Sequence, residues 1–555
     1  MDSSEVGRHT TDIRRRPPDT DRPTPTTLIP EAAGRCPATH AEGLTHAEDL
    51  THAEDLTHAE DLTQPVTVAH HEDLAERDAL AVAESDRTRS GPSRPGSWSA
   101  LTGWVATRPA LCHLPVVVLI VGYVARFSEL SLQIYNGYGE PPFDLGIFDQ
   151  GLWLLSRFHA PFVTIMGRNL FGDHASFILL PIVPLYWLFP EPQGLLVLQT
   201  CVLAAGAVPV YLLARNRLHS TALATLFAAA YLLNPALQQG NMEQFHPEAF
   251  LVLSIAVAVY AALERKSGLL AVAVAASLLV KEDTALLIVP LGLWVLVRRD
   301  RRWGIRIILA AVAWALFAYG VVLATILGTA TFYADRIPFG GMGGFFTTLF
   351  AHPARVWSYV RSGGRPFYLW QLGFSVGWGF VLAPEVAAIG LLTVAEDVLS
   401  TDPYMHQISY HYSMALVPVL VLGTVTAVAT LKTGTGRAVA TGVVTIFALW
   451  SCVLWGLAPF SHQRASYWNP SGAYVKSVNA VEAALPADAV VSAWYPYVAH
   501  IDHRANIYLW PTPFSAEYWG STQQSGERLP AADHVQFIML PARLGPTDAP
   551  TVLAR

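Results

Sequence analysis

The sequence predicts an all-α polytopic membrane protein with about eleven transmembrane helices, a disordered N-terminal tail and a small external α/β C-terminal domain. Hydrophobic residues make up 52% of the 555 residues, charged residues 14%, and the mean hydropathy is +0.34. Residues 1–100 alone hold 19 acidic and 10 basic side chains. The remaining residues therefore carry too few charges to cover several soluble domains. Long apolar runs recur between residues 109 and 458, which is typical of membrane-spanning helices.

The N-terminal tail, residues 1–100, is rich in Pro, Thr, Arg and acidic residues. It contains the hexapeptide THAEDL three times in tandem, at 45–50, 51–56 and 57–62. One Leu in each hexapeptide cannot bury a hydrophobic core, so we expect a disordered cytoplasmic tail. The tail also accounts for the net charge of −7. The rest of the chain has no basic face of the kind that binds nucleic acid, and nucleic acid is not expected as a partner.

The predicted transmembrane domain, residues 109–458, contains twelve apolar runs. They lie at 109–129, 176–190, 195–214, 220–238, 247–263, 268–280, 284–297, 305–328, 367–383, 385–399, 412–431 and 437–458. Run 176–190 is only 15 residues long and contains Pro181 and Pro184. Because a span needs about 20 residues, we expect this run to lie in the outer interface, which leaves eleven spans.

Basic residues occur in alternate connections between these runs, as at Arg215 and Arg217, at Arg265 and Lys266, and at 298–302. The positive-inside rule places such connections in the cytoplasm. We therefore predict a multi-pass protein of the plasma membrane with a cytoplasmic N-terminus, and with external loops at 130–194 and 329–366.

Loop 329–366 does not fit this rule, because it would be external and yet carries four arginines. These are Arg336, Arg355, Arg361 and Arg365, against a single Asp335. Two interpretations stay open. Either the topology differs at this point, or the arginines have an anionic partner outside the membrane.

Residues 459–555 are less apolar than the preceding runs. The segment 474–485 has helical periodicity, whereas 489–493, 505–510 and 534–540 have the composition of strands. This pattern predicts a small external α/β appendage.

Polar residues at the predicted outer ends of the runs are the candidate site, because ionisable groups at membrane depth are costly and usually functional. The first group lies in 141–158, where Asp144 and Asp149 are surrounded by apolar residues. A short amphipathic helix on the membrane would leave both carboxylates facing water or a cavity. The alternative is structural: Asp144 caps a helix and Asp149 is a solvated charge.

Two further groups follow on the same predicted side. FGDHASF, at 171–177, places His174 at headgroup level, and QQGNMEQFHPE, at 238–248, contains Glu243 and His246. Glu248 follows Pro247 and fits the first turn of the next helix, where a carboxylate is favoured by the helix dipole.

The segment around Lys281, Glu282 and Asp283 lies between apolar runs of 13 and 14 residues. Helices of that length reach only about 20 Å, so the turn should lie below the outer surface, where its cation could bind a lipid-linked phosphate. An internally neutralised turn is the structural alternative. The connection 395–412 adds His411 and Tyr412 to the candidate residues.

The order of these motifs resembles a known family. FDLGIFDQGLW, GDHASF, QFHPE, KED and YHY resemble a bacterial family of predicted multi-pass membrane proteins of unknown function, over roughly residues 110–510. More distantly, the chain resembles the GT-C superfamily of integral-membrane glycosyltransferases, which take a sugar from a polyprenyl-phosphate donor. The sequence has no P-loop, GxGxxG, HExxH or GxSxG motif.

The GT-C resemblance implies a GT-C-like fold and roles for four residues. Asp144 matches the acidic residue that serves as catalytic base, with Asp149 second. His174 is at the position where relatives often have a His-Pro dipeptide before an interfacial segment. Lys281 is at the position where some relatives have a Lys at an external helix end near the donor phosphate. Two departures are present: the usual acidic pair is here Asp144-Leu145, and KED replaces Lys-Gly.

The resulting hypothesis is a glycosyltransferase that moves a sugar from a polyprenyl-phosphate-linked donor to an acceptor at the outer face, with membrane lipid as its other partner. The residues expected to bind substrate or phosphate are His174, Glu243, His246, Lys281, Glu282, Asp283, His411 and Tyr412. The scheme requires no cofactor, but a divalent cation bound by Asp144 or Glu243 stays open as an alternative. The alternatives are a transporter or flippase, with a site built from discontinuous helices, and a non-catalytic envelope scaffold.

Overall fold

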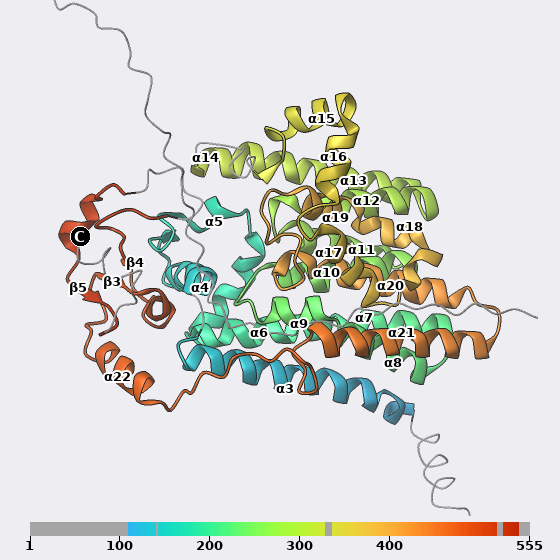
Figure 1. The fold of residues 1–555 in the computed structure, drawn as a ribbon, viewed down its shortest axis with the longest axis horizontal. Helices are drawn as coiled ribbons and strands as arrows, with labels where there is room; N and C mark the ends of the chain where they lie inside the picture. Colours follow the sequence, from blue (N-terminus) through green and yellow to red (C-terminus); the bar gives the residue numbers. More distant parts are fainter. Residues whose placement is uncertain (1–108, 140–141, 328–335, 519–525, 543–555) are drawn as a thin grey trace, which may run out of the picture. The chain divides into compact units, whose positions relative to one another are not determined.

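The computed structural model describes residues 109–139, 142–327, 336–518 and 526–542. The predicted disordered tail at 1–100 lies outside these residues. The described chain is mostly helical, with a small sheet near its C-terminal end (Figure 1).

The helices follow the apolar runs closely in the first part of the chain. In chain order they are η2 (Pro109–His113), α3 (Leu114–Asn136), α4 (Pro142–Ser156), α5 (Leu170–Asp173), η3 (Phe177–Trp187), α6 (Pro192–Ala205), α7 (Ala207–Leu218), α8 (Thr221–Leu232), α9 (Pro235–Asn241), α10 (Glu248–Leu263), α11 (Ser267–Leu278), η4 (Glu282–Thr284), α12 (Ala285–Arg298) and α13 (Arg301–Phe317).

The π-helical segment η5 (Ala318–Leu323) continues α13 into α14 (Ala324–Leu327). The remaining helices are α15 (Gly341–Ala351), α16 (Pro353–Val360), α17 (Arg365–Phe374), η7 (Gly379–Leu382), α18 (Pro384–Ala387), η8 (Ala388–Gly390), α19 (Leu391–Leu399), η9 (His411–Ser413), α20 (Leu416–Ala429), α21 (Gly434–Trp455), α22 (Ala473–Glu482), η10 (Tyr495–His500) and η11 (Pro530–His534).

Among the described residues, five helices are long and apolar enough to cross a membrane. They are Leu111–Asn136, Pro192–Leu218, Arg301–Ile326, His411–Ala429 and Gly434–Trp455. Shorter apolar helices include Thr221–Leu232, Glu248–Leu263 and Ser267–Leu278. The protein is therefore a membrane protein, whereas eleven spans and their orientation stay predictions.

The run 176–190, predicted not to cross, forms the 3₁₀ helix η3, which contains Pro181 and Pro184. Each proline removes a backbone donor, which prevents a regular α-helix. At about 2 Å per residue, eleven residues reach roughly 22 Å, less than the ~30 Å of a hydrocarbon core.

The runs 367–383 and 385–399 do not form single helices. After α17 the backbone enters the left-handed region at Gly377 (φ 59°) and Trp378 (φ 54°) and continues as the short η7. The second run is divided into α18, η8 and α19. Neither run is one continuous helix of spanning length.

The helical core is built from successive helices that pack as pairs: α7 with α8, α10 with α11 and α12 with α13. Asp300 caps α13 by accepting a hydrogen bond from the backbone N–H of Trp303 at 2.9 Å, which satisfies an otherwise unpaired donor. Helix α20 is apolar and buried along nearly its whole length and contacts α7, α8 and α10. A helix that is apolar on all sides belongs in the centre of a bundle.

The three strands predicted near the C-terminus are present, each shorter than predicted. They are β3 (Val491–Ala493), β4 (Ile507–Leu509) and β5 (Phe537–Met539), and they form a parallel sheet in the order β4-β3-β5. Val491 pairs with Ile507 on one side and with Phe537 on the other. The predicted helix at 474–485 is α22. A second, antiparallel pair, β1 (Phe162–Val163) with β2 (Arg168–Asn169), lies in the loop before α5.

Helix α4 and the C-terminal segment share one hydrophobic core. Leu145 and Leu152 of α4 pack in the same cluster as Val491 of β3 and Val498 of η10. The prediction of a helix here is confirmed, but the helix lacks the exposed polar face of an amphipathic surface helix. Most of its side chains are buried because the C-terminal segment covers it, a long-range contact that the local sequence pattern does not contain.

Candidate functional site

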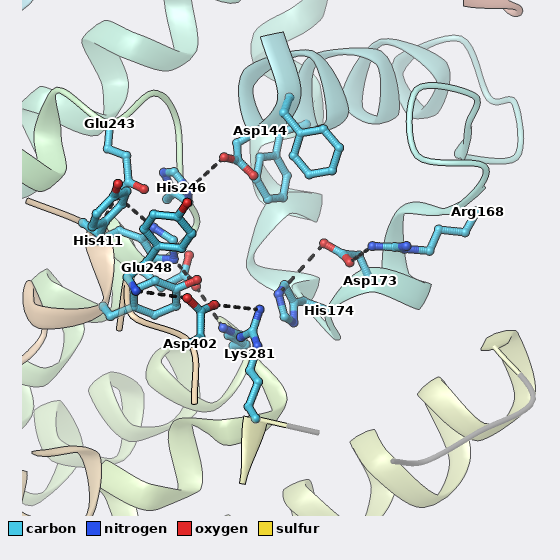
Figure 2. Close-up of a pocket in the computed structure, with 16 residues that line it drawn as sticks. Asp144, Arg168, Asp173, His174, Glu243, His246, Glu248, Lys281, Asp402 and His411 are labelled. Carbon is cyan, nitrogen blue, oxygen red and sulfur yellow. Dashed lines mark hydrogen bonds and ion pairs between the residues drawn. The ribbon is translucent and has the colours of Figure 1, made fainter. Parts of the chain in front are cut away.

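A polar cavity of about 160 Å³ lies where the loop after α3 meets the ends of α10, α11 and α20 (Figure 2). Its lining combines five carboxylates, three permanent cations, three histidines and five aromatic rings. The lining residues are Phe143, Asp144, Phe148, Arg168, Asp173, His174, Glu243, His246, Glu248, Lys281, Arg336, Asp402, Tyr404, Tyr410, His411 and Tyr412.

Seven of the ten residues named as site candidates line this cavity. They are Asp144, His174, Glu243, His246, Lys281, His411 and Tyr412. The other three do not line it. Glu282 lies behind His174, Asp283 contacts Lys281, and Asp149 belongs to a separate cluster.

Asp144 lies in the first turn of α4 and reaches across the cavity to His246 (Figure 2). Its Oδ2 lies 3.5 Å from Nε2 of His246. Burial alone would lower the pKa of His246, but the carboxylates of Asp144, Glu243 and Glu248 outweigh burial and raise it to about 9. His246 is therefore an imidazolium at neutral pH.

The backbone around this pair is held by two buried glutamines. Gln244 accepts a hydrogen bond from the backbone N–H of Leu145 at 3.1 Å. Gln199 accepts one from the backbone N–H of His246 at 2.7 Å and donates to the carbonyl of Gln244. Because these hydrogen bonds are buried, they fix the position of α4 relative to the segment before α10.

His246 and His411 stack, with ring centroids 3.8 Å apart and planes inclined by 22°. Glu243 orients His411: its Oε2 lies 3.1 Å from Nδ1 and accepts a hydrogen bond from the backbone N–H at 2.5 Å. Two stacked imidazoles with carboxylates on either side form a wall that can hold or transfer protons.

Lys281 lies between α11 and η4 and is 7% exposed. Its Nζ lies 3.3 Å from Oε1 of Glu248 and 3.3 Å from Oδ2 of Asp283. Burial would lower the pKa of Lys281, but the surrounding carboxylates outweigh burial and raise it well above its usual value. The turn is thus partly neutralised, as in the structural alternative, and also presents a permanent cation to the cavity.

His174 and Glu282 form a buried pair, with Nδ1 and Oε1 at 2.7 Å. Oε2 of Glu282 also accepts a hydrogen bond from the backbone N–H of Ala175 at 3.0 Å. Burial and Lys281 act to lower the pKa of His174, but Glu282 and Asp173 raise it above its usual value. Burial acts to raise the pKa of Glu282, and His174 outweighs it, so that this pKa is lowered.

Several lining residues were missed as site residues from the sequence. Glu248 was interpreted as a helix-dipole residue; it does open α10, but it also pairs with Lys281. Asp173 pairs with Arg168 of β2, and Asp402 lies 3.9 Å from a guanidinium nitrogen of Arg336. Arg168 and Asp402 lie in a very short strand and an irregular segment, where no periodicity singles out a side chain.

The four arginines of loop 329–366 have different environments. Arg336 lines the cavity and lies near Asp402. The guanidinium of Arg365 is buried and donates to the backbone carbonyls of Val398 and Ser400. Arg355 and Arg361 lie over the rings of Phe339 and Trp357, respectively. Of the four, Arg336 is the one that lines the cavity, and Arg365 is the one whose guanidinium is buried against backbone carbonyls.

The cavity wall also contains a set of atoms that could bind a divalent cation. Glu243, His246 and His411 each offer one ligand atom, and these atoms lie within 4.8 Å of one another. Both ring nitrogens of His246 are buried without a hydrogen bond from the described residues. One carboxylate and two imidazoles suit zinc and related metals, but His246 could bind such an ion only after its imidazolium loses a proton.

Together, the fold and the cavity define a helical membrane protein with a charged cavity, walled on one side by a helix that packs against the C-terminal segment. Residues 141–540 match the family model described as "Predicted membrane protein (DUF2079)". The match covers most of the chain, and the protein belongs to this family. No curated protein matches the chain.

Proposed function

We propose that the protein is a glycosyltransferase that moves a sugar from a polyprenyl-phosphate donor to a hydroxyl acceptor at the outer face of the membrane. One observation carries the proposal. The carboxylate of Asp144 opens into the same cavity as the cations of Arg168, Lys281 and Arg336. A base on one side and cations on another match what displacement of a lipid phosphate by a hydroxyl requires.

Asp144 is the carboxylate best suited to be the base. Its side chain is 34% exposed, compared with 14–19% for Asp173, Glu243, Glu248 and Asp402. Those four carboxylates each pair with a neighbouring Arg, Lys or His. Among the described residues, the ion pair of Asp144 is with His246, at 3.5 Å. Its greater exposure leaves a face of the carboxylate for the acceptor.

The proposed step is a direct displacement. The acceptor oxygen forms a bond to the anomeric carbon while its proton passes to the carboxylate of Asp144. The bond between the anomeric carbon and the phosphate oxygen breaks, and the electron pair leaves on the polyprenyl phosphate. Lys281 and the lining arginines stabilise this charge electrostatically, and the configuration at the anomeric carbon is inverted.

The imidazolium of His246 would hold Asp144 in place and add positive charge to the cavity. Aromatic rings of Phe143, Tyr404 and Tyr412 line the same space. Their flat apolar faces can pack against the C–H face of a sugar ring, which supports a carbohydrate as the group that binds.

The transporter hypothesis predicts a site formed by discontinuous helices. Helices α17 to α19, at 365–399, are broken, but the lining residues of the cavity come from other segments. Lys281 lies in the short connection between α11 and α12, so the break in the chain at that point is equally compatible with a transporter. The observation that favours the transferase is the carboxylate beside the cations, which transport alone does not require.

The test is transfer of radiolabelled sugar by the purified protein in reconstituted vesicles supplied with polyprenyl-phosphate sugars. Exposed substitutions Asp533→Asn and Lys476→Ala provide matched controls. We expect the wild-type protein to transfer sugar from at least one donor, and both control variants to transfer it at the same rate. If the wild-type protein transfers nothing from any donor but moves labelled donor across the vesicle membrane, the transporter replaces this proposal.

A further inference from the structure

A second buried polar cluster lies outside the cavity, between α4 and the C-terminal segment. It consists of Asp149 of α4 together with Asp502 and His503, which follow η10. One ligand atom from each of the three lies within 4.8 Å of the others. Oδ2 of Asp149 faces Nε2 of His503 at 2.8 Å. None of the three lines the cavity described above, so the proposed reaction does not use them.

The burial of this cluster is unfavourable without a further positive charge. Asp149 and Asp502 are 0% and 1% exposed. Within the described residues, Oδ2 of Asp502 accepts no hydrogen bond. Two adjacent carboxylates in a dry core cost free energy unless a proton or a cation lies between them.

Nearby side chains supply that positive charge only in part. Arg504 attracts the carboxylate of Asp502 electrostatically, but no ion pair joins the two among the described residues. The guanidinium of Arg504 donates to the backbone carbonyls of Ile501, Pro486 and Ala489. Arg157 and Glu191 also act electrostatically on His503. Of these two, only Arg157 is positively charged.

We propose that Asp149, Asp502 and His503 bind one divalent cation of the zinc class. Two carboxylate oxygens and one imidazole nitrogen form a three-ligand set of the kind zinc accepts, with a fourth position for water. His503 is the outermost ligand, with its side chain 28% exposed, so it marks the entry side of the site. In a tetrahedral zinc site, ligand atoms lie about 3.3 Å apart, and small side-chain movements reach that geometry.

Neighbouring side chains orient the ligands, as the hydrogen-bond partners of metal ligands commonly do. The hydroxyl of Tyr186 donates to Oδ1 of Asp149 at 2.5 Å, which leaves Oδ2 for the ion. The ring of His503 stacks on Trp153 of α4, with centroids 5.8 Å apart and planes inclined by 12°. These contacts restrict both ligands to the orientations in which their metal-binding atoms converge.

The ion would join the C-terminal segment to α4 at a defined point. Asp149 lies five residues after Asp144 on α4, about 140° further around the helix. The bound ion would therefore fix the side of α4 that faces away from the cavity while Asp144 faces into it. This inference does not depend on the proposed reaction, because it concerns only the attachment of two segments.

The test is metal analysis of the full-length protein, purified in detergent, stripped with chelator, incubated with Zn²⁺ and freed of excess metal. The variants are Asp502→Asn and His503→Gln, with His411→Gln to report on the second candidate set in the cavity wall. We expect one zinc per wild-type chain, retained in His411→Gln and lost in the other two. Zinc that is lost only in His411→Gln would place the ion in the cavity and contradict the inference, as would zinc-free wild-type protein.

Thermal unfolding is an independent test, because the direction of the change in the unfolding midpoint distinguishes a bound metal ion from a shared proton. If the cluster binds zinc, chelation lowers the unfolding midpoint of the wild type and has no effect on Asp502→Asn. If the two carboxylates only share a proton, Asp502→Asn relieves their repulsion. The variant then unfolds at a higher temperature than the wild type, whether metal has been added or removed. Should a variant not fold, Co²⁺ loading of the wild type replaces it: visible absorption bands of a four-coordinate site support the inference, and their absence overturns it.

Discussion

Oδ2 of Asp144 lies 3.5 Å from Nε2 of His246, and this contact joins the first turn of α4 to the segment that precedes α10 (Figure 2). It places a partly exposed carboxylate beside a fully enclosed imidazole at one end of a charged cavity. The two buried glutamines behind it, Gln199 and Gln244, hold both backbones in register. The pair is therefore the centre of the proposed site.

The pair makes stability depend on pH. The pKa of His246 is raised from 6.5 to about 9 in the folded protein, so its protonation stabilises the fold fully below about pH 6.5 and progressively less as pH rises through 9. We expect the unfolding midpoint of the wild type to fall between pH 6.5 and pH 9.5. In Asp144→Asn this fall should be smaller. An equal fall in both proteins would show that Asp144 does not set the pKa of His246.

The positions of several site residues could be predicted because they follow from local chemistry. His246 and Lys281 are polar residues at the ends of strongly apolar runs, where a charge is too costly to be incidental. Arg168 and Asp402 could not be predicted in this way, because they lie in a two-residue strand and an irregular connection. Their arrival at the cavity depends on long-range packing.

For Asp149, the sequence predicted the helix on which the residue lies but not the residues that it contacts. Its apolar neighbours correctly indicated a helix, but its partners Asp502 and His503 lie at the far end of the chain. No periodicity connects the two segments. The breaks at Gly377 and Trp378 likewise follow from backbone conformation, whereas hydropathy alone indicated an uninterrupted run.

Glu282 supports the cavity from behind. Glu282→Gln keeps the shape of the side chain but removes its negative charge. That charge pairs with His174 and also strengthens the hydrogen bond that the side chain accepts from the backbone N–H of Ala175. We expect a loss of roughly 1.5–3 kcal/mol of stability, measured as a lower thermal unfolding midpoint in detergent. The exposed Glu527→Gln is the control. No difference between the two variants would mean that the pair contributes nothing to the fold.

The predicted topology places residue 216 in the cytoplasm and residue 340 outside. Single cysteines at these positions, in a chain from which the four native cysteines have been removed, can be tested with a membrane-impermeant thiol reagent on intact cells. We expect labelling at 340 and not at 216, because the arginines around 216 favour the cytoplasmic side. Labelling at 216 but not at 340 would show that the chain has the opposite orientation, with the cavity at the cytoplasmic face.

Lys281→Ala tests the role of the buried cation. It removes the positive charge expected to bind the donor phosphate and leaves Asp144 untouched. Transfer assays at increasing donor concentration should show a raised donor requirement, with much of the maximal rate recovered at saturation. Lys476→Ala, on the exposed face of α22, should behave as the wild type. A lowered maximal rate with an unchanged donor requirement would exclude a phosphate-binding role for Lys281.

The most direct test of the proposed function is the transfer rate of Asp144→Asn at saturating donor and acceptor in reconstituted vesicles. Asn keeps the size of the side chain but cannot accept the acceptor proton at a useful rate. We expect transfer to fall by about 10²–10⁴-fold, while the variant inserts into the membrane as the wild type does and Asp533→Asn keeps full activity. Full transfer by Asp144→Asn would contradict the assignment of this carboxylate as the base and, with it, the proposed transfer mechanism.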